Sequence, residues 1–559
     1  MARKSGPEIV LLAADELDWL LAQLRAALPA QLYQRVEALL RTLQWLWAVI
    51  EEKKTSLRRL RRVLFGARTE KTDSLFPNDK EGQGPSTQDK PAQKHKRKGH
   101  GRNGAQAYSG AKRICVHHAQ LKAGGVCPKC KKGKLYLLRT PARLVRIMAQ
   151  PIFSAVIHEL ERLRCALCGA VFTAAAPPEA GASKYDPSVG IMLAVMRYGA
   201  GQPLYRMDKW QSYFGVPLPA STQWELIEEA SHTPGLIYDA LIDAAAQATL
   251  LYQDDTTMRV QSLGQPRANP IPPGDPQSDS RTGVFTTGIV AQIGAPPGNP
   301  NPQGGRRVAL FFTGQNHAGE NLDQLLKRRA PGLEKPIQMC DALSRNVSRE
   351  FETILCNCLL HARRGFVDAA PDFPEECRRV IESLREVYRT DALAKQNNLS
   401  AIERLALHQE RSRPVMDQLH GWMRQQFDEK RVEPNSGLGQ AIRYMVKHWE
   451  KLTRFLEVPG APLDNNTVER ALKMAILHRR NSLFFRTLNG ARIGDIFMSL
   501  IHTCQLEKVN PFDYLMALQS HSQKVARAPE QWFPWNYRQT MENPTATNST
   551  ATLLLSAPG

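Results

Sequence analysis

Two short apolar segments that each end in an aspartate constrain the fold of this chain more than any other feature. The segment "TLLYQD" ends at Asp254, and "PIQMCD" ends at Asp341. The apolar or alternating runs "GVFTTGIVAQIG" and "RRVALFFTG" lie between them. Runs of this length and pattern predict β-strands, so the middle of the chain should contain a sheet that carries acids at the ends of strands.

A third acid, Glu469, stands near the start of the helical pattern "PLDNNTVERALKMAILHRR". Two strand-end aspartates and a helical glutamate are what a ribonuclease-H-like sheet uses to hold two Mg²⁺ ions, which prefer oxygen ligands and leave sites open for phosphate and water. Asp341 lies 87 positions after Asp254, and Glu469 lies 128 positions after Asp341. The second gap leaves room for a helical insertion before the last acid.

Each of these acids also has a plainer interpretation. Asp254 and Asp255 are residues that suit a turn. Asp341 suits the N-cap of a helix that would begin at "ALSRN". Glu469 would only close a capping box if Asn466 were the N-cap, because it follows Asn466 by three positions. Spacing alone therefore leaves both interpretations open.

The helix that contains Glu469 favours the metal-binding interpretation. At about 100° per residue, Lys473 and Arg480 fall within about 40° of Glu469 on the helix surface. A carboxylate with cations on either side suits a metal ligand beside a bound phosphate backbone. Glu469 and Lys473 also have the spacing of an ordinary intrahelical ion pair, which contributes little.

Two CxxC pairs indicate a second metal site. "CPKC" holds Cys127 and Cys130, and "CALC" holds Cys165 and Cys168. Four thiolates in two pairs suit one tetrahedral structural Zn²⁺, with strands of a zinc ribbon between the pairs. A redox-active CxxC is the alternative, which two matched pairs disfavour. Three further potential ligands nearby are expected not to bind the metal: Cys115, His117 and His118.

The net charge of +20 predicts a polyanionic partner such as nucleic acid, the ribosome or an anionic membrane surface. The sequence contains no run of about 18 apolar residues, so no membrane span is expected. The amino-terminal residues have acids within their apolar part and do not resemble a signal peptide. Ten cysteines, four of them in the CxxC pairs, suit a reducing cytosol.

Two further segments predict helices with possible roles in association and DNA binding. Residues 8–66 have a helical pattern with a coiled-coil-like seam of about four heptads, or else an amphipathic helix packed on its own domain. Residues 204–230 have the outline of a helix-turn-helix in which Ser221 or Thr222 caps the second helix, or of a plain helical hairpin. The seam residues are Val36, Leu39, Leu43, Leu46, Ile50, Leu57, Leu60 and Leu64.

With these features in place, the chain resembles the transposases of the insertion-sequence family IS66. The resemblance is spread over about residues 57–537 and includes, in the family's order, "LFGARTEK", "GHGRNGAQAY", "RCALCG", "YRMDKWQ", "RTGVFTTG", "FFTGQNHAGENL", "CLLHARRGF", "PLDNNTVERA" and "HRRNSLFF". The cysteine pairs and the "DNN…ER" segment are the most specific of these motifs.

The resemblance implies an Asp-Asp-Glu active site on a ribonuclease-H-like core. Asp254, Asp341 and Glu469 match its three acids and would bind two Mg²⁺ or Mn²⁺ ions. The family's first motif usually reads Asp-Glu-Thr, whereas this chain has Asp254-Asp255-Thr256. Because neighbouring strand residues face opposite ways, only one aspartate should bind metal; we expect Asp254, with Asp255 as the alternative.

A Cys-x-x-His-x-Arg-Arg motif also matches the family. It comprises Cys358, His361, Arg363 and Arg364. A second metal site, a DNA contact and packing are all compatible with this motif, and we expect positioning and DNA contact rather than a metal. The predicted DNA-binding residues are Lys473, Arg479, Arg480, Arg363 and Arg364.

The function implied is a bacterial transposase that acts in the cytoplasm at the nucleoid. Its partners would be double-stranded DNA (terminal inverted repeats and target DNA), a second copy bound through the N-terminal helix, and small accessory proteins of the same element. The alternatives are a zinc-containing DNA-binding regulator without catalysis and a nuclease with the same core.

The fold expected is a multidomain α/β chain. In order, it comprises a helical coiled-coil region (1–76), a basic flexible linker (77–106), a zinc-binding domain (107–180), a helix-turn-helix-like segment (181–245), the first part of the catalytic core (246–346), a helical insertion (347–460), the last part of the core with C-terminal helices (461–537) and a disordered tail (538–559).

Overall fold

The computed structural model contains two compact units, Met1–Gln83 and Gly84–Gly559, which are described separately. Within the described residues, no helix is long and apolar enough to cross a membrane. The structure describes residues 14–29, 32–41, 106, 115, 120–136, 138, 152–164, 168, 171–181, 183–263, 283–294 and 305–542.

The first unit contains helix α1 (Ala14–Ala27) and a second helical segment over residues 32–41. The helix predicted across residues 8–66 is therefore interrupted. Pro29 lies at the interruption, where its carbonyl accepts hydrogen bonds from the amides of Leu32 and Tyr33 at 2.9 and 3.0 Å. Proline has no amide hydrogen with which to continue the first helix. Most of the predicted seam lies outside the described residues, so self-association through it stays a prediction.

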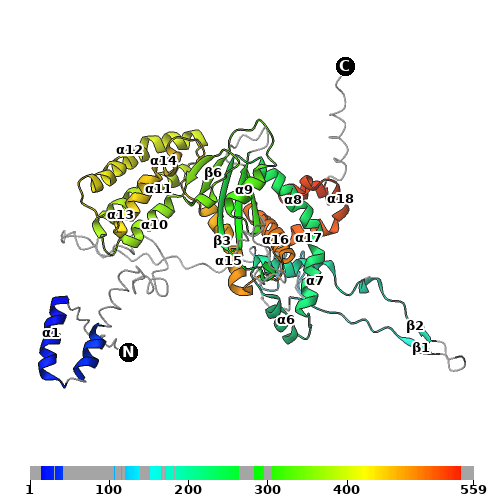
Figure 1. Cartoon of the computed structure of the whole chain (residues 1–559). Helices are drawn as coiled ribbons and strands as arrows, with labels where there is room; N and C mark the ends of the chain where they lie inside the picture. Colours follow the sequence, from blue (N-terminus) through cyan, green and yellow to red (C-terminus); the bar gives the residue numbers. More distant parts are fainter. Residues whose placement is uncertain are drawn as a thin grey trace, which may run out of the picture. The chain divides into compact units, whose positions relative to one another are not determined.

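The second unit is built around a mixed five-stranded sheet with the strand order β5-β4-β3-β6-β7 (Figure 1). Strand β4 runs antiparallel to both of its neighbours, β3 and β5, whereas β3, β6 and β7 are parallel. The four strands expected from the sequence are confirmed, and the fifth, β7, is additional. The bounds are β3 Leu250–Thr257, β4 Phe285–Ile293, β5 Arg306–Gly314, β6 Ile337–Cys340 and β7 Ile354–Asn357.

Helices cover both faces of this sheet and one of its edges. Helix α15 (Asn466–Ser482) packs on β3 and β4 on one face, and α9 (Ala318–Leu326) packs on the same strands from the other face. The Tyr238 hydroxyl of α8 (His232–Ala246) donates to the Phe311 carbonyl of β5 at 2.7 Å. Buried apolar residues of β3, β4, β5 and these helices form one continuous core.

Edge strand β5 is protected by side chains of helix α16 (Leu488–Leu506). Asp495, Ser499 and Thr503 are spaced by four residues on α16 and accept hydrogen bonds from the amides of Thr313, Phe311 and Ala309 at 2.7, 2.9 and 3.0 Å. Four helical residues rise about 6 Å, which is close to the length of two strand residues. The edge amides, which would otherwise be open to another strand, are therefore satisfied within the chain.

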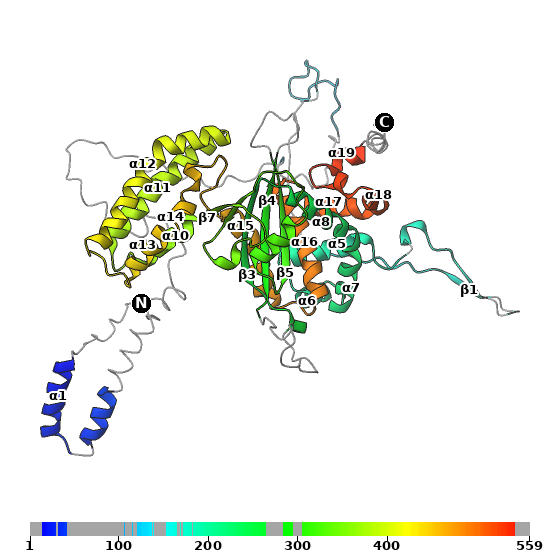
Figure 2. The ribbon, with the colours of Figure 1, turned by 45° about the horizontal axis from the view of Figure 1, so that its top comes forward.

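The predicted helical insertion is present and packs beside the β7 edge, through contacts of α14 with β7. Figures 1 and 2 show α11 and α12 side by side within it. It begins later than expected, because the short apolar segment "ILCN" forms β7 rather than helix. Its bounds are α10 Leu359–Ala369, α11 Pro374–Gln396, α12 Ala401–Asp428, α13 Gly437–Lys447, α14 Trp449–Leu452 and a 3₁₀-helix at Arg454–Leu456.

The remaining helices correct two expectations. Helix α7 begins at Ala220 with Pro219 as the N-cap and no capping side chain, so Ser221 and Thr222 lie inside the helix rather than capping it. The tail expected to be disordered from residue 538 is helical as far as Glu542. The bounds are α5 Pro187–Ala194, a π-helix Val195–Gly199, α6 Leu204–Tyr213, α7 Ala220–Ala230, α17 Pro511–Ser520, α18 Ser522–Arg527 and α19 Tyr537–Glu542, with 3₁₀-helices at Pro178–Ala180, Gln261–Leu263, Ser344–Asn346 and Pro529–Trp532.

The first cysteine pair lies on a tight turn. The Cys127 amide donates to the Gly133 carbonyl at 2.7 Å, and the Gly133 amide donates to Cys130 Sγ at 3.4 Å. This contact is the first cause of a lowered pKa of the Cys130 thiol. Two antiparallel strands, β1 (Arg162–Arg164) and β2 (Val171–Thr173), flank the second pair. Cys168 of that pair is exposed, and Cys165 lies outside the described residues, as do residues 77–105 of the predicted linker.

Candidate active site

The parallel pairing of β3 with β6 places Asp254 and Asp341 side by side. Leu250 pairs with Ile337 and Tyr252 with Met339, so the register offset between the strands is the same 87 positions that separate the two acids. Asp254 lies near the end of β3, and Asp341 directly follows β6. In parallel strands at the same register, side chains point to the same face of the sheet, so the two carboxylates lie close together.

An asparagine amide links the two carboxylates. Asn346 Nδ2 donates to Asp341 Oδ1 at 2.6 Å and lies 3.5 Å from Asp254 Oδ1. Asn346 is fully buried, and its backbone carbonyl oxygen accepts hydrogen bonds from the side-chain amides of Gln253 and Gln338. The position of its side chain is therefore set by the core rather than by solvent.

Asp254 carries a carboxyl group whose ionisation is opposed by its surroundings. Burial first, and then the charges of Asp341, Asp255 and Glu469, raise the pKa of Asp254 to about 7. Within the part of the chain that the structure describes, neither Asp254 nor Asp341 forms an ion pair. Acids that are gathered without a balancing cation fit a site that receives one.

Glu469 reaches this site because helix α15 lies close to the sheet. Gly288 of β4 is the register partner of Asp254. A Cβ atom added at Gly288 would lie 3.0 Å from Leu472 Cδ2 and 3.2 Å from Val468 Cγ2 on α15. The missing side chain therefore allows the turn of α15 that contains Glu469 to pack directly beside Asp254.

The capping-box interpretation of Glu469 is not supported by this geometry. The N-cap of α15 is Asn465 rather than Asn466, and it makes no capping side-chain hydrogen bond. Its side-chain amide instead donates to the Gln253 carbonyl of β3 at 2.9 Å. Glu469 is thus the fourth residue of the helix, and its carboxylate is available to the site.

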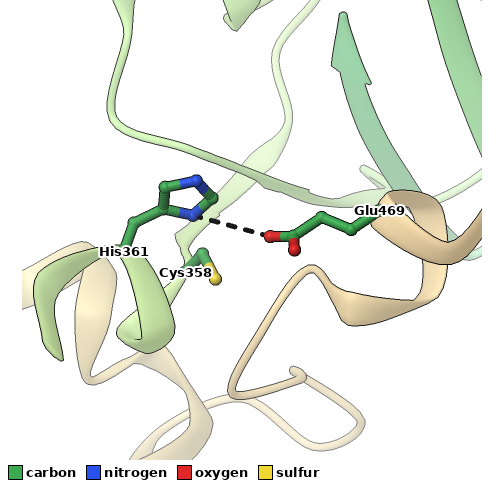
Figure 3. Close-up of side chains that lie close together, drawn as sticks. All are labelled: Cys358, His361 and Glu469. Atoms are coloured by element: carbon green, nitrogen blue, oxygen red, sulfur yellow. Dashed lines mark ion pairs between the residues drawn. The ribbon is translucent and has the colours of Figure 1, made fainter. Parts of the chain in front are cut away.

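Figure 3 shows Cys358, which is the N-cap of α10, close to His361 of α10 and Glu469 of α15. His361 Nδ1 lies 3.9 Å from Glu469 Oε1, and one ligand atom from each of the three residues lies within 4.8 Å of the others. His361 Nδ1 is shielded from solvent and has no hydrogen-bond partner. Cys358 Sγ accepts a hydrogen bond from the Asn465 amide at 3.3 Å. The first half of the Cys-x-x-His-x-Arg-Arg motif therefore contacts the third acid and the segment before it.

Asp255 occupies the opposite face of β3. Its carboxylate is almost fully buried and lies 3.0 Å from His317 Nδ1 and 3.5 Å from Arg345 Nη2. The guanidinium of Arg345 in turn lies 5.9 Å from the centre of the Phe285 ring. Asp255 is therefore engaged with His317 and the Arg345 guanidinium, away from Asp341, and the geometry favours Asp254 as the first acid of the site.

Some of the predicted DNA-binding side chains are exposed, and one, Arg479, forms hydrogen bonds within the protein. Lys473, Arg480 and Arg364 are exposed, and Arg363 is half-buried. Arg479 Nη1 donates to Thr256 Oγ1 at 3.2 Å and to the backbone carbonyl of Thr257. This guanidinium therefore braces the end of β3, a role that the sequence prediction did not include.

Three features of the site were missed by sequence reasoning: Asn346, Gly288 and the orientation of His361. The segment "DALSRN" places Asn346 five residues after Asp341, a spacing short enough to suggest a shared site. The glycine in "GVFTTGIVAQIG" interrupts a strand, which is a known sign of close backbone approach. The 108 positions between His361 and Glu469 offered no local signal.

The profile of the "Transposase IS66 family" matches residues 183–270 and 295–493. These ranges contain all three acids together with Gly288's helix neighbours and the Cys-x-x-His motif. The chain belongs to the IS66 family of transposases. The family assignment inferred from the sequence motifs is thereby confirmed, and the matched ranges cover β3, β5, β6, β7 and the helical insertion, whereas β4 lies between them.

Three proteins of Sinorhizobium fredii are similar to this IS66-family chain. Uncharacterized protein y4hP is 25% identical over 431 residues, which is 72% of this chain and 70% of that protein. Uncharacterized protein y4jD is 27% identical, covering 62% of this chain and 65% of its own length. Uncharacterized protein y4qI is 25% identical, covering 62% and 61% respectively.

Proposed function

We propose that this IS66-family chain cuts and joins DNA at the ends of an insertion sequence, with Asp254, Asp341 and Glu469 as ligands of two Mg²⁺ or Mn²⁺ ions. The observation that carries the proposal is the placing of Asp254 and Asp341 on adjacent parallel strands, where Asn346 Nδ2 lies 3.5 Å from the first carboxylate and 2.6 Å from the second. Burial and the other acids raise the pKa of Asp254 to about 7, as a site for a cation requires. The sheet order with one antiparallel strand supports a ribonuclease-H-like core for this reaction.

The residues of the chain have distinct roles in the proposed reaction. Asp254 and Asp341 provide oxygen ligands on a rigid sheet, and Asn346 orients both carboxylates. His361 positions Glu469 from α10. When bound, the metal pair would activate first water and then the released 3′-hydroxyl, and would stabilise the leaving oxygen of an in-line displacement. Lys473 and Arg480 hold the phosphate backbone beside Glu469. No covalent link between protein and DNA is required.

DNA recognition and assembly form the second part of the proposal. Cys127, Cys130, Cys165 and Cys168 bind one structural Zn²⁺, for which the lowered pKa of Cys130 is favourable because the thiolate is the ligand. The zinc module and the helices α6 and α7 contact the terminal inverted repeats. The N-terminal helical region joins two copies, and accessory proteins of the element assist.

The test is a nicking and strand-transfer assay on DNA that carries the element's own terminal repeats. With Mg²⁺, wild type should release a 3′-hydroxyl end and join pre-cut ends to target DNA. Repeat binding without nicking would instead indicate a regulator, and nicking without joining would indicate a nuclease.

Metal analysis tests the zinc site separately from catalysis. Freshly purified wild-type protein should contain close to one tightly bound zinc, and Cys130→Ser should lose the metal and bind the repeats more weakly. Zinc-free wild-type protein would contradict the proposed module while leaving the Asp254 site untouched.

A further inference from the structure

A second candidate site lies immediately beside Asp341, on the side of the helical insertion. An open cavity of about 410 Å³ is lined by the segment that follows β6, by β7 and by the end of α13 with α14. Its lining includes Ala342, the residue after Asp341, together with Lys447, His448 and Lys451 of the insertion. Nothing in the proposed metal chemistry requires this cavity.

The charged side chains that line the cavity are all basic. Arg349, Lys447 and Lys451 are exposed, and none of the described lining residues is an acid. The pKa of His448 is lowered, first by burial and then by the charges of Lys447 and Lys451. The two lysines therefore act on the imidazole of His448, which lies between them in the sequence.

The nearest acids along the chain do not neutralise these cations. Glu350 pairs with Lys327 at 3.0 Å, and Glu450 pairs with Arg454 at 2.6 Å. Within the described residues, no ion pair involves Arg349, Lys447 or Lys451. Like charges that are gathered without partners destabilise one another, so their arrangement indicates an anionic ligand.

The cavity is held rigidly and is connected to the active site. Asp323 anchors the segment that carries Arg349, accepting hydrogen bonds from the Ser348 hydroxyl at 2.5 Å and the Arg349 amide at 3.2 Å. The lining residue Asn357 donates its side-chain amide to the Asp341 carbonyl at 3.2 Å. Burial first, and then the charge of Asp341, raise the pKa of Tyr444 on α13 to about 12, which places this residue of the insertion near Asp341. The insertion thus places its cations at a fixed position next to Asp341.

We propose that this cavity binds a phosphodiester group of the DNA strand that enters the Asp254–Asp341–Glu469 site. This inference rests on the proposed function, because it takes the ligand of the cavity to be the same DNA strand that the acids would cut. The helical insertion would then contact DNA directly. Lys447 and Lys451 from the insertion and Arg349 from the core would bind the same phosphodiester group. A free phosphate or pyrophosphate offers the same chemistry and is the competing ligand.

Lysine footprinting of the full-length protein tests the proposal without knowledge of the repeats. A generic DNA duplex is bound in Ca²⁺, exposed amines are acetylated, and each lysine is quantified by mass spectrometry. We expect Lys447 and Lys451 to be protected several-fold by the duplex. Lys430, an exposed residue in the turn after α12 that lines a different cavity, is the control. Equal labelling of all three lysines with and without DNA would overturn the proposal.

Salt-dependent binding of the same duplex gives an independent measurement. Lys447→Ala and Lys451→Ala should each reduce the slope of log affinity against log salt by about one, as expected for one lost phosphate contact. Lys451→Arg should retain the slope, and Lys430→Ala should not change it. Because both lysines are exposed, melting temperatures should stay close to wild type.

Two further measurements distinguish a failure of the cavity proposal from a failure of the proposed catalytic function. Protection of Lys447 and Lys451 by millimolar pyrophosphate but not by DNA would assign the cavity to a free phosphate and reject the strand-binding proposal. The nicking assay reports on the proposed function alone. Active nicking without DNA protection of the lysines would refute only the cavity, whereas protection without nicking would support the cavity and refute only the catalytic function.

Discussion

Two partly or fully buried aspartates of this molecule, Asp254 in the sheet and Asp391 in the insertion, are surrounded in opposite ways. Asp254 has acids as neighbours and a pKa raised to about 7. Asp391 lies 2.8 Å from Arg404 Nε, 2.7 Å from Lys395 Nζ and 3.4 Å from His408 Nε2. Although burial opposes its ionisation, these partners hold the pKa of Asp391 well below its usual range.

The comparison distinguishes Asp391, whose charge stabilises the fold, from Asp254, whose charge has no ion-pair partner among the described residues. The partners of Asp391 come from α11 and α12, so its charge ties the two long helices of the insertion together. Asp254 ties nothing together through charge, since its neighbours repel it. A folded chain tolerates such repulsion where function requires it, and a divalent cation would remove it.

The largest expected effect is loss of catalysis at the unpaired acids. Asp254→Asn, Asp341→Asn and Glu469→Gln should each reduce nicking and strand transfer by roughly a thousandfold or more, because each removes a charge that stabilises the metal pair. Repeat binding and melting temperature should change little.

Asp255→Asn is the matched control, since its side chain lies on the opposite face of β3. Near-normal strand transfer by Glu469→Gln would remove Glu469 from the site and make Asp464 the next acid to examine.

The paired acid should show the opposite behaviour. Asp391→Asn should lower the free energy of unfolding by about 3 kcal/mol, because the half-buried Arg404 guanidinium then loses its counter-charge and the buried His408 loses a carboxylate partner. Per folded molecule, metal-dependent nicking should be retained. Denaturant titration beside the nicking assay measures both quantities, and a stability equal to wild type would contradict the structural role assigned to Asp391.

The two acids should also respond to pH in opposite directions. The folded-state pKa of Asp254 is raised, so the stability associated with its proton is present below about pH 4 and lost as the pH rises through about 7. Asp391 has a lowered pKa, so its contribution is present above about pH 4 and lost in stronger acid.

Mg²⁺ must displace the proton of Asp254. The stabilisation of the folded protein by Mg²⁺ should therefore be larger at pH 8 than at pH 6. Thermal unfolding with and without Mg²⁺ at both pH values checks this. Asp254→Asn should abolish the pH dependence. Asp495→Asn should leave it intact, because Asp495 also has a pKa raised to about 7 by burial but bonds Thr313 away from the site. An Mg²⁺ effect independent of pH would argue against Asp254 as a ligand.

The smallest effects concern two cations of α15. Lys473→Ala should leave stability unchanged and reduce the salt dependence of DNA binding by a slope of about one. Arg479→Ala should cost about 1 kcal/mol of stability, since its guanidinium donates hydrogen bonds to Thr256 and Thr257. Equal loss of DNA affinity in both variants would show that Arg479 also contacts DNA.

The sequence by itself determined the elements that carry the acids. Apolar runs ending at Asp254 and Asp341 formed β3 and β6, and Glu469 lies in the first turns of the predicted helix α15. These features were predictable because they depend on local patterning and turn chemistry. The segment "ILCN" is too short for such a pattern, and β7 was therefore missed.

The tertiary structure alone decided which groups meet. The choice between Asp254 and Asp255 depends on which face of β3 receives α15 and which receives His317 beside α9. The approach of His361 to Glu469 and of Lys451 to the segment after Asp341 joins residues more than a hundred positions apart. Such contacts arise from the packing of whole helices and strands, in which a buried glycine or amide sets the distance between two elements. Local sequence patterns contain no information about that packing.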